Sequence, residues 1–237
     1  MNKYVTGMLC LFAASALGLS AESLSYTGTL SSPESAFQTT FTLPAAGSVT
    51  FQTWGFGGGI NAAGQVIPAG GFDPLIALFS GSGPTANIVV DGSSNPLADA
   101  DNLSNPPWSF VGNCPPAGTV AIGSNNDCGD DFMQTPLPAG TYTLLLTDAN
   151  YIPQAIFDNG TLSEGFVDLT GGVFQTCDPG SGACINPNGN YAVDIVSDQQ
   201  ILTSTTPEPS TFLLLCSGLA LLAGAKLLNP RRIPPRT

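Results

Sequence analysis

The sequence predicts an all-β protein, built as an antiparallel β-sandwich or jelly roll of roughly eight to ten strands. Apolar and polar residues alternate in several short segments, so that each segment has one face suited to a core. Glycine, proline, asparagine, serine and threonine are abundant between those segments and favour turns and loops. Outside the two ends of the chain, no segment shows a sustained helical period.

The first half of the domain contains two strands joined by a turn. Residues 35–43 alternate well, and the sequence Pro-Ala-Ala-Gly at 44–47 predicts a turn into a second strand at 48–56. The glycine-rich stretch 57–71 is typical of a flexible loop. Two short apolar strands are expected next, at 75–79 and 88–91.

The second half begins with a long polar insertion at 95–131. A turn at 138–140 precedes a strand at 141–147, in which Leu145 faces away from the side shared by its apolar neighbours. Residues 166–169 and 173–176 flank Gly171-Gly172, which predicts a hairpin. The alternating segment 191–196 closes the series.

The first 21 residues have the layout of a secretory signal peptide. Lys3 is the only charge before Glu22, and an apolar stretch ends in small residues that suit signal peptidase. Residues 1–21 are therefore expected to be removed. Residues 22–203 then form the exported domain, whose length suits a single core.

The C-terminal tail, residues 207–237, contains an apolar run at about 210–228 that approaches the roughly 20 residues of a membrane-spanning helix. Basic residues follow the run and place that end in the cytoplasm. They are Arg231, Arg232 and Arg236. These features alone are compatible with an ordinary membrane anchor.

Pro207-Glu208-Pro209 stands directly before the run, and the order of tripeptide, apolar helix and basic end (Arg231, Arg232) resembles the PEP-CTERM sorting signal of Gram-negative bacteria. The resemblance implies recognition by an exosortase, a membrane processing enzyme of species that make extracellular polysaccharide. It implies a cell-surface or extracellular location, with a transient anchor in the inner membrane.

Charge is distributed unevenly along the chain. All five lysine and arginine residues lie in the two targeting segments, all seventeen acidic residues lie between Glu22 and Glu208, and histidine is absent. The exported domain therefore has no side-chain cation, so binding to nucleic acid is not expected. Its carboxylates must be solvated, accept backbone hydrogen bonds or meet an external cation. We expect mutual repulsion to raise the pKa of clustered groups such as Asp130-Asp131.

Several motifs of the domain also resemble the bacterial pre-peptidase C-terminal-like β-sandwich. They are Phe41 to Phe51, Phe72 to Phe79, Leu137 to Leu146 and Asn190 to Ile195. In that family an acidic pair follows a loop, and Asp130-Asp131 matches it here. The resemblance covers about residues 35–196, but the insertions at 57–71, 95–128 and 150–189 are longer than the family's.

Four cysteines belong to the exported domain: Cys114, Cys128, Cys177 and Cys184. An oxidising compartment and an even count favour disulfides, of which three connectivities are possible. Local pairing of Cys114 with Cys128 and of Cys177 with Cys184 is favoured because each pair brackets one loop. A zinc site is the alternative, and it would need four thiolates to converge.

The composition leaves few routes to catalysis. Without histidine or an exported lysine, the chain cannot form a Ser-His-Asp triad, a Cys-His pair or a Schiff base. A glycosidase needs only two carboxylates across a cleft. Its candidates are Asp73, Asp91, Asp130 and Asp131. The spacing does not pair them, and aspartates of this kind commonly form turns.

Calcium is the better cofactor hypothesis. Carboxylate and amide oxygens are the ligands calcium prefers, and two glycine-containing loops supply them without matching EF-hand spacing. The candidate ligands are Asp99, Asp101, Asp127, Asp130 and Asp131. Turn formation is the alternative explanation for both loops.

The composition and the tail together predict a noncatalytic exported surface or matrix protein linked to exopolysaccharide. The alternative is a binding module whose aromatic side chains stack on sugar rings. Trp108 is the main candidate, because it follows Pro106-Pro107 in a polar loop. Tyr151 and Trp54 are further candidates, and core packing is preferred for Trp54.

Overall fold

The computed structural model describes residues 22–99, 121–122, 127–177 and 184–203. The chain divides into two units, Met1–Leu202 and Thr203–Thr237. Within the described ranges no helix is long and apolar enough to cross a membrane. The predicted signal peptide and the predicted span at 210–228 lie outside those ranges.

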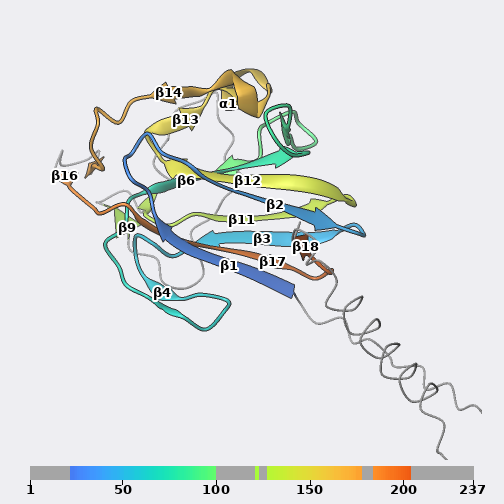
Figure 1. Ribbon diagram of the computed structural model, residues 1–237, viewed down its shortest axis with the longest axis horizontal. Coiled ribbons are helices and arrows are strands. Elements are labelled where there is room, and N and C mark those ends of the chain that lie inside the picture. The colour runs from blue at the N-terminus through green and yellow to red at the C-terminus, as the bar shows by residue number, and fades with distance from the viewer. Residues whose placement is uncertain (1–21, 100–120, 123–126, 178–183, 204–237) are drawn as a thin grey trace, which may run out of the picture. The chain divides into compact units, whose positions relative to one another are not determined.

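Two antiparallel sheets form the first unit (Figure 1). The four-stranded sheet has the order β1-β17-β3-β11 and consists of β1 (Glu22–Thr29), β3 (Gly47–Thr53), β11 (Phe132–Leu137) and β17 (Asn190–Ser197). The six-stranded sheet has the order β18-β2-β12-β6-β7, with β8 also paired to β6. Its strands are β2 (Phe37–Leu43), β6 (Pro74–Ser80), β7 (Asn87–Ile88), β8 (Ala98–Asp99), β12 (Gly140–Asp148) and β18 (Leu202–Thr203).

The long strands change sheets as the chain proceeds, from β1 to β2 to β3 to β6, and from β11 to β12 to β17. This alternation is the connectivity of a jelly roll. The prediction of an all-β antiparallel sandwich is therefore confirmed for the described residues.

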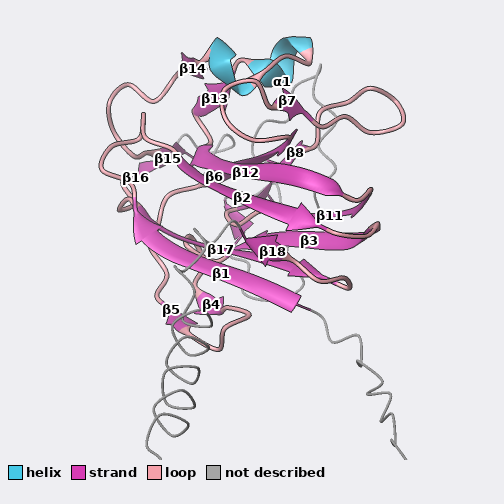
Figure 2. Cartoon of the chain, turned by 45° about the vertical axis from the view of Figure 1, so that its right-hand side comes forward, coloured by secondary structure: helices cyan, strands magenta, loops and turns pink. Residues whose placement is uncertain are grey.

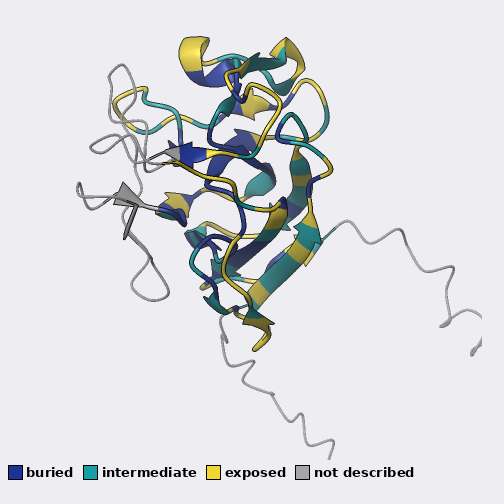
Figure 3. Cartoon of the chain, turned by 90° about the vertical axis from the view of Figure 1, so that its left-hand side faces the viewer, coloured by how far each residue is buried: buried dark blue, intermediate teal, exposed yellow. Residues whose placement is uncertain are grey.

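The main core lies between the two sheets, because each contributes its alternate side chains to it. Phe51 of β3 and Ile195 of β17 are direct neighbours in the register, and both are fully buried. Phe41 of β2 packs its ring against those of Phe51 and Tyr142, at centroid distances of 6.0 and 5.7 Å. Figure 3 shows these buried strands enclosed by more exposed loops.

A second core covers the outer face of the six-stranded sheet. Its lid, here called the cap, comprises β13 (Tyr151–Pro153), α1 (Ala155–Asp158), the 3-10 turn η1 (Leu162–Glu164) and β14 (Phe166–Asp168). Ile152 and Ile156 of the cap pack with Leu75 and Phe79 of β6 and with Leu145 of β12. The predicted orientation of Leu145 is confirmed, since its neighbours Leu144 and Leu146 belong to the main core. Figure 2 shows the cap beside β6 and β12.

Three two-stranded ribbons complete the described structure. They are β4 (Gly59–Ile60) with β5 (Val66–Ile67), β9 (Ala121–Ile122) with β10 (Asp127–Cys128), and β15 (Thr176–Cys177) with β16 (Cys184–Ile185). The first ribbon occupies the stretch expected to be a flexible loop.

The hairpin predicted around Gly171-Gly172 is wrong. The two glycines do make a turn, with φ values of 63° and 80°. However, β14 pairs with β13, where the Phe166 ring stacks on Tyr151, and β15 pairs with β16. The stacking of two aromatic rings in β13 and β14 thus accompanies a pairing that local turn chemistry did not indicate.

Candidate functional site

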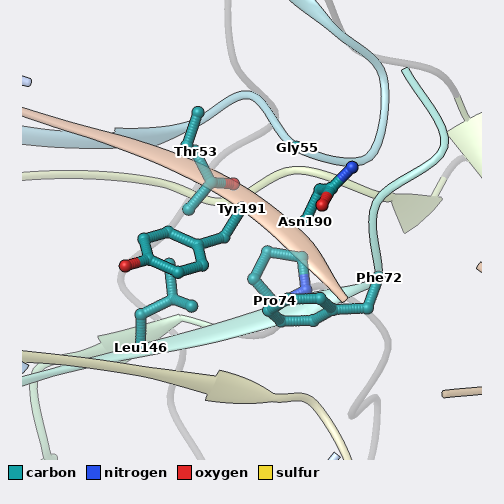
Figure 4. Close-up of a pocket in the computed structure, with 8 residues that line it drawn as sticks. Thr53, Gly55, Phe72, Pro74, Leu146, Asn190 and Tyr191 are labelled. Carbon is teal, nitrogen blue, oxygen red and sulfur yellow. The ribbon is translucent and has the colours of Figure 1, made fainter. Parts of the chain in front are cut away.

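Carboxylates gather at one end of the sandwich. Asp73 precedes β6, Asp130 and Asp131 precede β11, and Asp148 ends β12. These strand ends lie close together, because Thr53 of β3, Pro74 of β6 and Leu146 of β12 line one narrow gap (Figure 4). This gap has no room for a water molecule. It is therefore a packing gap rather than a binding site.

Asp130 is a hydrogen-bond hub for the turn after β3. Its Oδ1 accepts the Thr53 hydroxyl at 3.0 Å and the Phe56 amide at 3.1 Å, and its Oδ2 accepts the Gly57 amide at 2.6 Å. The side chain is 1% exposed. Burial raises the pKa of the Asp130 carboxyl to about 6, although the Gly57 and Phe56 amides act to lower it.

Asp131 forms hydrogen bonds to Thr53, the last residue of β3, through its main chain. Its amide donates to the Thr53 hydroxyl at 2.8 Å, and its carbonyl oxygen accepts the Thr53 amide at 3.0 Å. Its side chain is fully buried. Strand β3 ends at Thr53, three residues before the end of the predicted strand 48–56, and the Phe56 and Gly57 amides beyond it bond to the Asp130 carboxylate instead of a neighbouring strand.

The predicted calcium ligands are only partly within the described residues. Asp99 and Asp127 lie in β8 and β10, Asp101 lies outside the described ranges, and Asp130 already accepts three protein donors. Among the described residues, no group of three or more histidine, cysteine or acidic side chains is arranged to hold a metal ion. The calcium site stays a prediction.

A second acidic group was not anticipated from the sequence. Asp148 is 2% exposed and accepts the Asn150 amide at 2.9 Å. Burial raises the pKa of its carboxyl to about 6, and repulsion from Glu34 and Asp168 adds to the rise. Thr170 joins those two acids, because its hydroxyl lies 3.1 Å from Glu34 Oε1 and 2.8 Å from Asp168 Oδ1. Glu34, Asp148 and Asp168 are far apart in the chain, so their spacing in the sequence does not predict that they lie near one another.

Asp194, in the middle of β17, fixes the β4–β5 ribbon to the outer face of the four-stranded sheet. Its Oδ1 accepts the Ser25 hydroxyl at 2.6 Å, and its Oδ2 accepts Trp54 Nε1 at 2.8 Å and the Ala62 amide at 2.7 Å. The Trp54 ring covers Gly59, where an added Cβ would lie 2.6 Å from it. Trp54 is therefore half-buried and packs on the outer face of the four-stranded sheet, outside both cores, so the core packing preferred from the sequence is wrong.

The other candidate aromatics have different outcomes. Trp108 lies outside the described residues. Tyr151 is half-buried and stacks on Phe166 with a centroid distance of 4.3 Å and an interplanar angle of 10°. The structure therefore gives Tyr151 a supporting role for Phe166, a residue that the sequence did not single out.

Two open pockets lie on the described surface. The edge groove, about 550 Å³, lies between β11 and the segment 89–97; its lining includes Asp91, Gln134 and Tyr142. The cap pocket, about 360 Å³, lies between the six-stranded sheet and the cap. Its lining residues are Ala36, Gln38, Gly83, Pro84, Leu145, Leu162, Ser163 and Phe166. Both volumes are in the range of small-ligand sites.

The cysteine predictions are partly within the described structure. Cys184 is disulfide-bonded, and the β15–β16 register places Cys177 directly opposite it. The pairing of Cys177 with Cys184 stays a prediction. Cys128 lies in β10, and Cys114 lies outside the described ranges, as do the sorting residues Pro207, Glu208, Pro209, Arg231 and Arg232.

Comparison with known proteins adds no assignment. No protein-family model matches the chain, and no curated protein matches it either.

Proposed function

We propose that this chain is a noncatalytic exported protein of the cell surface or extracellular matrix, sorted by an exosortase-type system linked to exopolysaccharide. The predicted signal peptide (1–21) and the tail with Pro207-Glu208-Pro209 support export and sorting. The antiparallel sandwich supports the resemblance to the pre-peptidase C-terminal-like domain at the level of fold class only.

One structural observation carries the noncatalytic part of the proposal: aspartates that could have served catalysis are occupied in holding loops. Asp130 accepts three donors from the turn after β3. Asp91 accepts the amides of Ser93 and Asn95 at 2.7 and 2.9 Å and the Asn95 side chain at 3.1 Å. A glycosidase would need two carboxyls that face substrate. Asp91 and Asp130 instead stabilise the fold.

The sorting proposal is tested in a native host. We expect the surface or secreted fraction to contain a protein whose intact mass ends near Pro207, and replacement of Pro207-Glu208-Pro209 by alanines to retain the uncut chain in the membrane. Replacement of Pro234-Pro235 by alanines is the matched control, because it changes prolines of the same tail outside the tripeptide. A surface protein whose mass still includes Arg236 would instead support an ordinary anchor.

A ligand-binding module is the second candidate, and the two open pockets favour it. In this class the domain would hold a component of the matrix rather than modify it. Loss of glycan binding in Trp108→Ala would support the candidate named from the sequence, whereas the cap pocket offers a separate site.

A further inference from the structure

The cap pocket has a rigid frame. The amides of Leu162 and Ser163 donate to the carbonyl oxygens of Ala86 and Pro84, each at 2.9 Å, so the segment before β14 is bonded to the loop between β6 and β7. Glu164 Oε1 accepts the Thr161 amide at 2.9 Å and closes a capping box. The walls of the pocket are therefore preformed, which reduces the entropy lost on binding.

Its lining combines apolar surface with uncharged polar groups. Leu145 forms part of the floor, and Gln38 is its direct neighbour across the β2–β12 pair. The apolar side chains of Phe166 and Leu162 form part of the wall, and the Phe166 ring stacks on the Tyr151 ring. The exposed side chains of Gln38 and Ser163 supply an amide and a hydroxyl.

A row of threonines continues from the pocket along the same sheet face. Gln38, Thr40 and Thr42 share this face of β2, because successive side chains of a strand alternate. Across the sheet, the Thr40 hydroxyl lies 3.3 Å from that of Thr143, and the Thr42 hydroxyl lies 3.0 Å from that of Thr141. Thr143 is fully buried and its hydroxyl donates to the Gly81 carbonyl oxygen at 2.9 Å, so the accessible part of the row consists of Thr40, Thr42 and Thr141. The pocket and this row carry no acidic side chain, although the chain has seventeen acids.

We propose that the cap pocket and the adjoining threonine row bind an uncharged polysaccharide. One sugar ring places its C–H face against Phe166 and Leu162, while its hydroxyls bond to Gln38 and Ser163. Neighbouring sugars lie along the threonine hydroxyls. An anionic polymer is disfavoured, because the described domain presents carboxylates and no lysine, arginine or histidine.

The proposal rests on the noncatalytic surface role, and it selects the cap pocket over the edge groove. The edge groove contains Asp91, whereas the cap pocket has no charged lining residue. A wholly apolar ligand would cover the Gln38 amide without offering it a partner, at a cost in affinity, whereas the Ser163 hydroxyl would keep its bond to the Thr161 hydroxyl at 2.8 Å.

The test uses the full chain in a polyoxyethylene detergent and native gels that contain polysaccharide. The gels contain neutral glucans, mannans, galactans or xylans, with alginate as the anionic comparison. We expect retardation by at least one neutral polymer and none by alginate. Gln38→Ala should weaken binding about threefold to tenfold, as expected for one lost hydrogen bond. Ser163→Trp should abolish binding by filling the pocket.

Gln134→Ala is the matched control, since Gln134 is another exposed glutamine and lines the edge groove. It should bind like the wild type. All variants are first compared by thermal melting, because Gln38 and Ser163 are exposed and their replacement should preserve the fold. The proposal is overturned if no neutral polymer retards the chain, if alginate does so equally, or if only Gln134→Ala reduces binding. None of these results affects the intact-mass test of sorting.

Discussion

Buried carboxylates should make this protein more stable in mild acid than at neutral pH. Asp130 and Asp148 each have a folded-state pKa of about 6, against an ordinary value of 3.8. Between about pH 4 and 6 the folded chain therefore binds more protons than the unfolded chain, and the free energy of unfolding falls as pH rises through that range. At 1.36 kcal/mol per pH unit, each carboxyl contributes a loss of about 3 kcal/mol.

For a domain of this size, that loss corresponds to a fall in Tm of about 6 to 12 °C per carboxyl. Hydrogen bonds lower the folded-state pKa of Glu34, Asp91 and Asp168. These three carboxyls therefore stabilise the folded chain while they are ionised, and that stabilisation is lost as pH falls below about 4. We therefore expect the highest Tm between about pH 4 and 5. The measurement is a series of circular-dichroism melts of the full chain from pH 4 to 8 at constant ionic strength.

Variants assign the effect to the two aspartates. Asp130→Asn and Asp148→Asn should each remove about half of the decline in Tm, even if the lost hydrogen bonds lower Tm at every pH. Asp158→Asn, which removes a charge from the exposed end of α1, should keep the wild-type profile. A wild-type Tm that rises steadily from pH 4 to 8, or a full decline in both buried variants, would refute the reasoning.

Four further predictions concern the fold. Trp54→Phe should lower the free energy of unfolding by about 1 to 3 kcal/mol in urea titrations, because it leaves buried Asp194 without the indole donor. Leu145→Ala should cost about 2 to 5 kcal/mol in the same assay by opening a cavity under the cap. Non-reduced peptide mapping should recover Cys177 linked to Cys184, and Cys114 linked to Cys128. Raising NaCl from 0.05 to 0.5 M should increase Tm, because salt screens repulsion among carboxylates that have no neighbouring cation.

Each of these four predictions has an outcome that would contradict it. Trp54→Phe with the wild-type urea midpoint would show that the bond to Asp194 adds no stability. Leu202→Ala, at an exposed leucine, is the control for Leu145→Ala, and equal losses would argue against a second core. Cys177 linked to Cys114 would exclude local pairing. A Tm unchanged by NaCl would exclude net repulsion among the carboxylates. If Ca²⁺ raises Tm more than Mg²⁺ does, and the difference persists in Asp130→Asn, the calcium ligands are residues other than Asp130.

Sequence patterns predict the strands whose two faces differ. Strands β2, β12 and β17 begin and end within two residues of the predicted segments, because a register slip would turn their apolar side chains to solvent. The sequence also predicts that the pKa of Asp130 is raised, and the structure agrees. The cause of the rise differs from the expected one, because burial contributes most and repulsion from Asp131 was expected.

Other features depend on contacts between distant segments. Strand β1 was not anticipated, because Leu24 and Tyr26 are only half-buried and give a weak alternation beside the predicted cleavage region. Strand β11 contains Pro136, which argues against a central strand but is tolerated at the sheet edge that β11 occupies. The cap pocket joins β2 to residues more than a hundred positions later, so no local pattern reveals it.

The strand order has a consequence for how the chain acquires its structure. No two neighbours in the four-stranded sheet are consecutive in sequence, and β1 pairs with β17 in a register that joins Glu22 to Ser197. A chain that emerges from its N-terminus cannot complete this sheet until Ser197 has emerged. Such long-range pairing is slow to form. In a chain made from its N-terminus, β1 therefore has no partner in this sheet until β17 has been made.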